Sequence, residues 1–172
     1  MSENSKGIVP NATLGIWRVF GCQGLTSNDV IIQAMLDAYK AGVDDISISL
    51  GFGSGSANTP TSVVTRRIAA KCIPVIAAAG NEGEQDLMAL GGPSGGHGIT
   101  FVVSMDTEST RVSVFPGVGP PSEIDFKLDI GGFGGNIYST LPSYLDGTSG
   151  TSIATPYVAG AVALYLKQAE KS

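Results

Sequence analysis

The sequence is short of charge, cysteine and histidine. Of its 172 residues only 15% are charged, two are cysteines and one is a histidine. Two cysteines fit neither a disulfide framework nor a zinc site, so we expect Cys22 and Cys72 to be partly buried free thiols. A single bridge between them is the alternative, and it depends on a distance that the sequence does not contain. We expect no metal and no cofactor.

The chain also lacks a basic excess and a long hydrophobic run. Its net charge of −5 and a pI near 4.7 argue against a nucleic-acid partner, because no basic cluster could neutralise phosphates. The longest apolar run, residues 153–166, falls short of the roughly 20 residues that span a bilayer, so we expect no membrane segment. Residues 1–6 have no apolar core, so no signal peptide is expected, and the compartment stays open.

Glycine and apolar residues are plentiful instead. There are 24 glycines, and 42% of the residues are hydrophobic, which excludes a wholly disordered chain and indicates many tight turns. A length of 172 residues suits one domain, and we assign residues 1–172 to it.

Apolar periodicity predicts alternating strands and helices. Strand-like alternation or short apolar runs occupy residues 13–20, 45–50, 73–79 and 99–104, and helical spacing occupies residues 30–41 and 60–71. Residues 107–145 are rich in proline and glycine and read as a long irregular segment, with a short strand near residues 136–139. This order predicts an α/β fold with a mainly parallel sheet flanked by helices.

Binding sites in such sheets gather at the carboxyl ends of the strands. Three stretches rich in glycine or polar residues are expected there: residues 49–51, residues 80–81 and the turn before Ser152.

The most informative stretch runs from Gly150 to Gly160, Gly-Thr-Ser-Ile-Ala-Thr-Pro-Tyr-Val-Ala-Gly. It predicts a buried helix with Ser152 at or just before its first turn, where Pro156 is tolerated because first-turn N–H groups have no internal partner. A hydroxyl there lies beside free N–H groups that could stabilise an oxyanion. The alternative is an ordinary serine N-cap.

This stretch resembles the nucleophile motif of the subtilisin-like serine proteases, the subtilases. The resemblance implies a three-layer subtilisin-like fold, here without its N-terminal part, and serine endopeptidase activity with Ser152 as the nucleophile. Residues 77–83, Ala-Ala-Ala-Gly-Asn-Glu-Gly, resemble the subtilase segment that carries the oxyanion-hole asparagine, which implies that role for Asn81. Without the resemblance, Asn81 would be read as a turn residue.

The resemblance also implies where a polypeptide substrate binds. Ser49, Leu50 and Gly51 are similar to the family's Ser-Leu-Gly segment, whose backbone pairs with an extended substrate beside the main specificity pocket. Ala79 and Gly80 are implied on the opposite wall. The family is mostly secreted.

The sequence departs from the family at the other two members of the catalytic triad, the aspartate and the histidine. The family's aspartate and histidine motifs, Asp-Ser/Thr-Gly and His-Gly-Thr-His, do not occur in these 172 residues, and His97 has none of the catalytic histidine's neighbours. We therefore expect the chain alone to be a very poor protease. A truncated chain, a degenerate copy, and a chain that needs a complementary N-terminal subtilase segment as partner are all consistent with this.

Two other functions stay open at this point. One is a non-catalytic peptide-binding or inhibitory module that keeps the cleft at residues 49–51. The other is a dinucleotide-binding fold, because Gly51, Gly53 and Gly55 follow a strand. The G-x-G-x-x-G fingerprint needs its third glycine at position 56, where this chain has Ser56, and the next helix starts late. Both observations disfavour a dinucleotide site.

Overall fold

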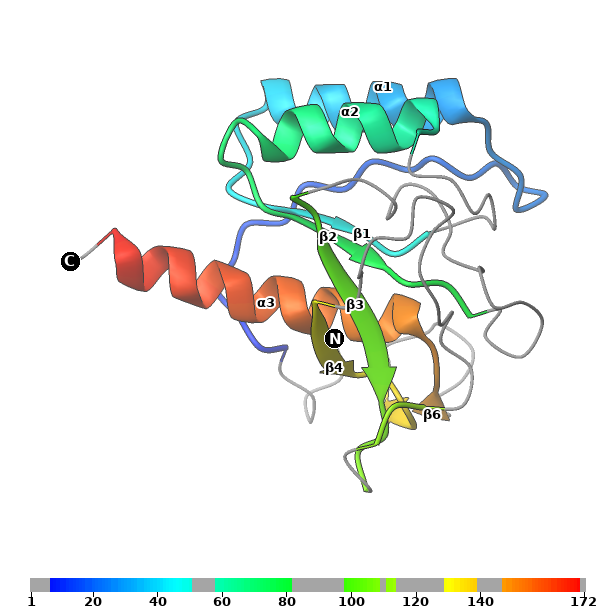
Figure 1. Ribbon diagram of the computed structural model, residues 1–172, viewed down its shortest axis with the longest axis vertical. Helices are drawn as coiled ribbons and strands as arrows, with labels where there is room; N and C mark the ends of the chain where they lie inside the picture. Colours follow the sequence, from blue (N-terminus) through cyan, green and yellow to red (C-terminus); the bar gives the residue numbers. More distant parts are fainter. Residues whose placement is uncertain are drawn as a thin grey trace.

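The computed structural model describes residues 7–50, 58–81, 98–108, 111–113, 129–138 and 147–170. At its centre is a sheet of four parallel strands in the order β1-β2-β3-β4 (Figure 1). The strands are β1 (Ile46–Ile48), β2 (Val75–Ala78), β3 (Thr100–Met105) and β4 (Ile130–Phe133). Two shorter strands, β5 (Ile137–Tyr138) and β6 (Gly147–Thr148), form an antiparallel pair.

Helices cover both faces of the sheet. Helices α1 (Asn28–Lys40) and α2 (Pro60–Ala69) lie on one face, and α3 (Thr151–Ala169) lies on the other (Figure 1). The predicted three-layer α/β fold with a parallel sheet is therefore confirmed.

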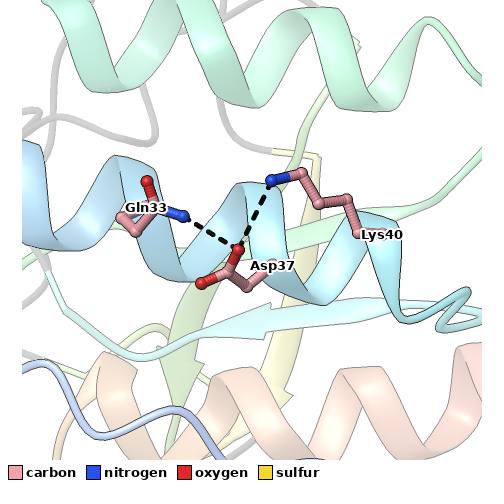
Figure 2. Close-up of polar contacts among 3 residues, drawn as sticks. All are labelled: Gln33, Asp37 and Lys40. Atoms are coloured by element: carbon pink, nitrogen blue, oxygen red, sulfur yellow. Dashed lines mark hydrogen bonds and ion pairs between the residues drawn. The ribbon is translucent and has the colours of Figure 1, made fainter.

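The apolar spacing of α1 explains its orientation. Ile31, Met35 and Ala38 recur at intervals of four and three and are all buried, which puts one stripe of the helix against the sheet. The opposite stripe is polar. There the Gln33 Nε2 donates to Asp37 Oδ1 at 2.8 Å, and the Lys40 ammonium lies 3.7 Å from the same oxygen (Figure 2).

Helix α2 begins where the sequence places its proline. Pro60 is the first helical residue, and the Thr59 hydroxyl accepts a hydrogen bond from the Ser62 N–H at 3.2 Å, which caps the helix. These local rules are why both helices were predicted to within a few residues of their observed ends.

Strand β2 is buried on both faces, as its unbroken apolar run predicts. Val75 and Ala77 face the cluster that α1 and α2 cover, whereas Ile76 packs with Ala154 and Val158 of α3. Complete burial of one such branched side chain stabilises the fold by about 1.5–3 kcal/mol. Packing on both faces thereby fixes the register of β2, the strand that leads to Asn81.

The strand expected at residues 13–20 is wrong. The segment has no strand assignment and pairs with no described strand. Alternation of side chains shows that a segment can form a strand, but the pairing itself needs a neighbour, and the described part of the chain has none there.

Strand β4, in contrast, lies inside the stretch read as irregular. Its sequence, Ile-Gly-Gly-Phe, has two residues that weaken strands, which is why the pattern hides it. A Cβ on Gly132 would lie 2.9 Å from the Ala154 carbonyl oxygen of α3, and one on Gly131 would overlap the Met105 side chain. Close packing therefore requires glycine at Gly132, where the contact is with the backbone of α3, whereas the Met105 side chain beside Gly131 is flexible and can move. Most of residues 107–145 outside β4 and β5 fall beyond the described ranges.

Three smaller expectations are corrected by the structure. Strand β1 is shorter than residues 45–50. Pro156 is the sixth residue of α3 and so lies past the first turn; because proline has no N–H, it cannot donate to the Ser152 carbonyl. Cys22 and Cys72 are free, as predicted, but both are exposed. None of the described helices is long and apolar enough to cross a membrane.

Candidate active site

Asn81 and Ser152 meet at the carboxyl edge of the sheet. The chain leaves β2 through Ala79 and Gly80 to reach Asn81, and α3 begins with Thr151 and Ser152. Gly80 has a φ of +95°, a conformation that glycine adopts without steric cost. The turn at Gly80 directs Asn81 to the first residue of α3, although the two segments are 70 residues apart in the sequence.

Two glycines, Gly134 and Gly150, determine how the chain enters α3. The Gly150 N–H donates to the Gly134 carbonyl at 2.8 Å, and the Gly150 carbonyl accepts from the Ile153 and Ala154 N–H groups. A Cβ on Gly134 would lie 2.6 Å from the Gly150 carbonyl oxygen and 2.8 Å from the Ser104 Oγ. Gly134 therefore lets β4 approach the start of the helix closely. Sequence reasoning missed this role.

The Asn81 side chain caps α3. Its Oδ1 accepts a hydrogen bond from the Thr151 N–H at 3.0 Å. The Thr151 hydroxyl lies 3.1 Å from that Oδ1 and 3.1 Å from the Gly80 carbonyl oxygen, so its one proton is shared between two acceptors. Gly150, the N-cap residue, has no side chain for this task. Asn81 supplies the capping oxygen from another part of the chain.

The same contacts fix which way the Asn81 amide points. A backbone N–H can only donate, so the atom that faces Thr151 must be the oxygen and not the nitrogen. The Nδ2 atom lies 3.5 Å from where a Cβ of Gly150 would stand, and the Oδ1 atom lies 3.7 Å from the same point. Thr151, which is completely buried, thus positions Asn81 and is a second residue that sequence reasoning missed.

Ser152 is the second residue of α3 and caps nothing. Neither its N–H nor its hydroxyl makes a hydrogen bond to any residue in the described ranges, whereas the N–H groups of Gly150, Thr151, Ile153 and Ala154 all have acceptors. The side chain is half-buried. The reading of Ser152 as an ordinary N-cap is therefore wrong.

Asn81 Nδ2 and the Ser152 N–H border one small space. The backbone nitrogen of Ser152 lies 3.8 Å from the Cβ position of Gly150, and Asn81 Nδ2 lies 3.5 Å from it. That space is free of side-chain atoms of residue 150 because the residue is glycine. Two N–H donors at a helix N-terminus, with the Ser152 side chain attached to one of them, can stabilise a negatively charged oxygen.

The remaining motif residues hold α3 in place. Ala154 is completely buried against Ile76 and Val102, and Thr155 is buried with its hydroxyl donating to the Thr151 carbonyl at 2.7 Å. Ser149, in the preceding Gly-Thr-Ser repeat, accepts a hydrogen bond from the Asn136 N–H at 2.9 Å. That contact gives Ser149 a structural part in the turn.

The predicted substrate-binding residues that the structure describes lie at the same edge. The pairing of Ile48 with Ala77 puts Ser49, which is exposed, one residue beyond the last paired position of β1. Leu50 packs against the core cluster beneath α1 and α2. The Ala79 methyl group is completely buried against Phe101 and Val103, so only its main chain can face a substrate. Gly51, and the Gly51–Gly55 stretch weighed as a dinucleotide site, lie outside the described residues.

The one histidine, His97, also lies outside the described residues. The structure therefore brings together Ser152, Asn81 and Gly80, and it puts Ser49 at the same edge of the sheet.

Comparison with known proteins identifies the family and the fold. The family model that matches is that of the subtilase family, over residues 1–172. The chain is 34% identical over 164 residues to subtilisin DY of Bacillus licheniformis, covering 94% of this chain and 57% of the relative. It is 36% identical over 178 residues to an intracellular serine protease of Paenibacillus polymyxa, covering 99% and 52%.

Solved structures agree with this. The prenylagaramide maturation protease PagA superposes with a TM-score of 0.74 at 26% identity, covering 89% of this chain and 54% of that one. A cold-adapted subtilisin-like serine proteinase gives 0.70 at 25% identity, covering 88% and 52%. The chain belongs to the subtilase family of serine proteases, and it spans about half the length of these relatives.

Proposed function

We propose that this chain is the nucleophile-bearing part of a subtilase endopeptidase, which hydrolyses peptide bonds through Ser152 with Asn81 in the oxyanion hole. The observation that carries the proposal is that two donor nitrogens, Asn81 Nδ2 and the backbone nitrogen of Ser152, lie 3.5 Å and 3.8 Å from the point where a Cβ of Gly150 would stand. In an acyl transfer, the Ser152 Oγ would attack the substrate carbonyl carbon. Its proton would pass to a base, and the carbonyl oxygen would become the oxyanion between the two donors.

The substrate is proposed to be an extended polypeptide. Ser49, Leu50 and Gly51 would pair with its backbone on one side, and Ala79 and Gly80 would border the side chain next to the scissile bond. Backbone pairing accepts many sequences, because every residue except proline offers the same N–H and C=O groups. This assignment is supported by the position of Ser49 beside the carboxyl end of β2.

The base is the part that this sequence does not supply. Its one histidine, His97, stands in a Ser-Gly-Gly-His-Gly stretch that does not resemble the family's histidine motif. We therefore propose that the chain alone hydrolyses peptides very slowly, and that a complementary subtilase segment contributes the aspartate and histidine. A triad that has lost members keeps only the residual catalysis of its oxyanion hole and substrate binding.

A serine-directed fluorophosphonate probe tests the nucleophile. With the complementary segment present to supply the base, we expect covalent labelling of the chain, detected by intact-mass spectrometry, that disappears in Ser152→Ala. Ser149→Ala is the matched control, because it removes a serine hydroxyl three residues away in the same Gly-Thr-Ser sequence and should label like the parent chain.

The outcome also separates the two functions. Labelling that survives in Ser152→Ala would contradict the assignment of the nucleophile. No labelling of the parent chain, even with the complementary segment present, together with retained binding of an extended peptide, would favour a non-catalytic peptide-binding module.

A further inference from the structure

One asparagine of the chain stands in a tripeptide that oligosaccharyltransferases recognise. Asn11, Ala12 and Thr13 form the sequence N-x-S/T, in which x is any residue except proline. No other asparagine in the 172 residues is followed two positions later by serine or threonine. The tripeptide contains none of the residues of the proposed active site, so that function does not account for it.

The local structure presents the tripeptide at the surface. The Ala12 N–H donates to the Val9 carbonyl at 3.1 Å, which closes a four-residue turn. Pro10 and Asn11 are its two central residues. Proline fixes φ at the first of these positions, and asparagine is common in turns. Asn11 is exposed, and so are Ala12 and Thr13, so an enzyme can reach all three residues without unfolding the chain.

The alternative is an ordinary turn asparagine. It explains Asn11 but not Thr13, because a turn does not need a hydroxyl two positions after its asparagine. The Asn11 amide and the Thr13 hydroxyl make no hydrogen bond to any described residue. Asn81 and Asn136 differ, because the Asn81 Oδ1 caps α3 and the Asn136 N–H donates to Ser149. Asn11 and Thr13 are therefore the pair whose side chains the described contacts leave unexplained.

The turn also lies away from the candidate active site. A Cβ on Gly160 of α3 would stand 3.1 Å from the Ile8 Cβ and 3.5 Å from the Val9 Cγ2, so the turn is held against the helix at Gly160. Figure 1 shows this blue N-terminal segment beside the middle of α3. Gly160 is eight residues after Ser152, which corresponds to about 12 Å along an α-helix. A bulky surface group on the turn does not need the space at Ser152.

We propose that Asn11 is the acceptor of an N-linked glycan, transferred from a lipid-linked oligosaccharide. The Asn11 Nδ2 forms a bond to the anomeric carbon of the first sugar, and the bond from that carbon to the pyrophosphate oxygen of the donor breaks. The Nδ2 group loses one proton to a base of the transferase, and the lipid pyrophosphate leaves with the bonding electrons. Nothing is oxidised or reduced. The proposal needs neither Ser152 nor Asn81, so it is independent of the proposed function.

Expression of the full chain in yeast, with a cleavable secretion signal ahead of Met1, tests the proposal. The chain from cells and from medium would be analysed together, so that poor secretion does not hide the result. We expect an increase in intact mass that peptide-N-glycosidase removes. This enzyme converts the glycosylated asparagine to aspartate, so peptide mapping should find aspartate at position 11.

Four variants distinguish the tripeptide from its surroundings. Asn11→Gln and Thr13→Ala should each lower glycan occupancy at least about tenfold, whereas Thr13→Ser should keep the glycan, since it keeps the hydroxyl. Asn28→Gln is the matched control, because Asn28 is an exposed asparagine outside any such tripeptide and its loss should leave occupancy unchanged.

A designed acceptor shows whether the chain reaches the transferase. Val30→Thr, combined with Asn11→Gln, makes a new N-x-T tripeptide at the exposed Asn28 and should restore one glycan. The folded state is checked by thermal unfolding, where the glycosylated chain and the enzymatically deglycosylated chain should have the same midpoint.

Three results would overturn the proposal. The first is glycosylation of the designed acceptor at Asn28 while Asn11 of the parent chain carries none. The second is a glycan that persists in Thr13→Ala or resists peptide-N-glycosidase, which would place it on another residue or in another linkage. The third is a glycosylated chain that does not unfold cooperatively, since Asn11 would then be an acceptor only in a misfolded chain.

Discussion

The start of α3 and residues 13–20 are both near the sheet, but they differ in how far the chain completes them. At the start of α3 the backbone N–H groups from position 150 to 154 are paired except that of Ser152, some of them by groups as distant in sequence as Asn81. In residues 13–20 none is paired with a described residue. At the start of α3, only the Ser152 N–H is left without an acceptor among the described residues. Residues 13–20, by contrast, have no neighbouring strand there.

This difference shows which parts of the site the chain can form by itself. The corner at Asn81, Gly150 and Ser152, where we propose the oxyanion hole, depends on contacts between β2, β4 and α3, which this chain contains. A strand depends on a partner, and the partner of residues 13–20 is not among the described residues. The proposed poor activity thus reflects a missing base, not a collapsed nucleophile site.

The largest expected effect comes from a substitution that keeps the Oδ1 acceptor of Asn81 and removes its Nδ2 donor. Asn81→Asp keeps the oxygen that caps α3 but removes the Nδ2 donor. We expect Ser152 labelling by the fluorophosphonate to slow by about 10²–10³-fold, the magnitude known for such a donor in subtilisin itself. The free energy of unfolding should be kept or raised by about 0.3–1 kcal/mol, because a carboxylate at a helix N-terminus is favourable.

Asn81→Ala is the matched variant, since it removes the cap and the donor together. It should lose labelling to a similar extent and, in addition, about 1 kcal/mol of stability by thermal unfolding. Labelling of Asn81→Asp at the parental rate would show that the amide is only a cap.

A smaller effect is expected from Gly134→Ala. The new methyl group would meet the Gly150 carbonyl at 2.6 Å, and this oxygen belongs to the backbone, so β4 or the start of α3 must shift. We expect a cost of about 1–3 kcal/mol in the free energy of unfolding, measured by urea denaturation.

Gly7→Ala is the control for that substitution, because a Cβ on Gly7 has no neighbour within 4 Å. If both variants were equally stable, the tight approach of β4 to α3 would not be needed to complete the corner.

A third prediction concerns the pH dependence that Asp45, the residue just before β1, gives to stability. Burial, and then the neighbouring Asp44 carboxylate, raise the pKa of Asp45 above its ordinary value of 3.8. Between that value and the raised one the folded state holds the proton more tightly than the unfolded chain, so stability falls as the pH rises through this window. The penalty is fully present once the pH is well above the raised pKa.

Asp45→Asn should remove this dependence. Because the carboxyl group keeps contact with solvent, the gain at pH 7 should be only about 0.5 kcal/mol, and it should vanish at a pH below 3.8. Thermal unfolding of both proteins at several pH values measures it, and an equal slope for the two would exclude Asp45 as the cause.

The smallest effect is expected at Ile16, in the unpaired segment. Its side chain is 86% exposed, so Ile16→Lys should change the stability of the chain alone by less than about 0.5 kcal/mol. A large loss in urea denaturation would mean that residues 13–20 already pack against the rest of the chain, and the contrast with the corner at α3 would fail.

Local patterns in the sequence were sufficient for the helices. Pro60 with Thr59, and the spacing of Ile31, Met35 and Ala38, act within one segment, so α1 and α2 were located from the sequence. The Gly-Thr-Ser-x-Ala-Thr-Pro motif likewise located Ser152 at the start of α3. Strand β4 was not found, because its two glycines weaken the strand pattern, and Gly132 is required by the backbone of α3, which is distant in the sequence.

The sequence by itself thus determined the class of fold, the helices, and the positions of Ser152 and Asn81. Only the tertiary structure decided that Asn81 caps α3 through its oxygen, that Ser152 keeps a free N–H, and that residues 13–20 remain unpaired. The reason is physical. A helix pairs its own N–H and C=O groups within a few residues, whereas strands, distant caps and free donors are set by what another part of the chain brings beside them.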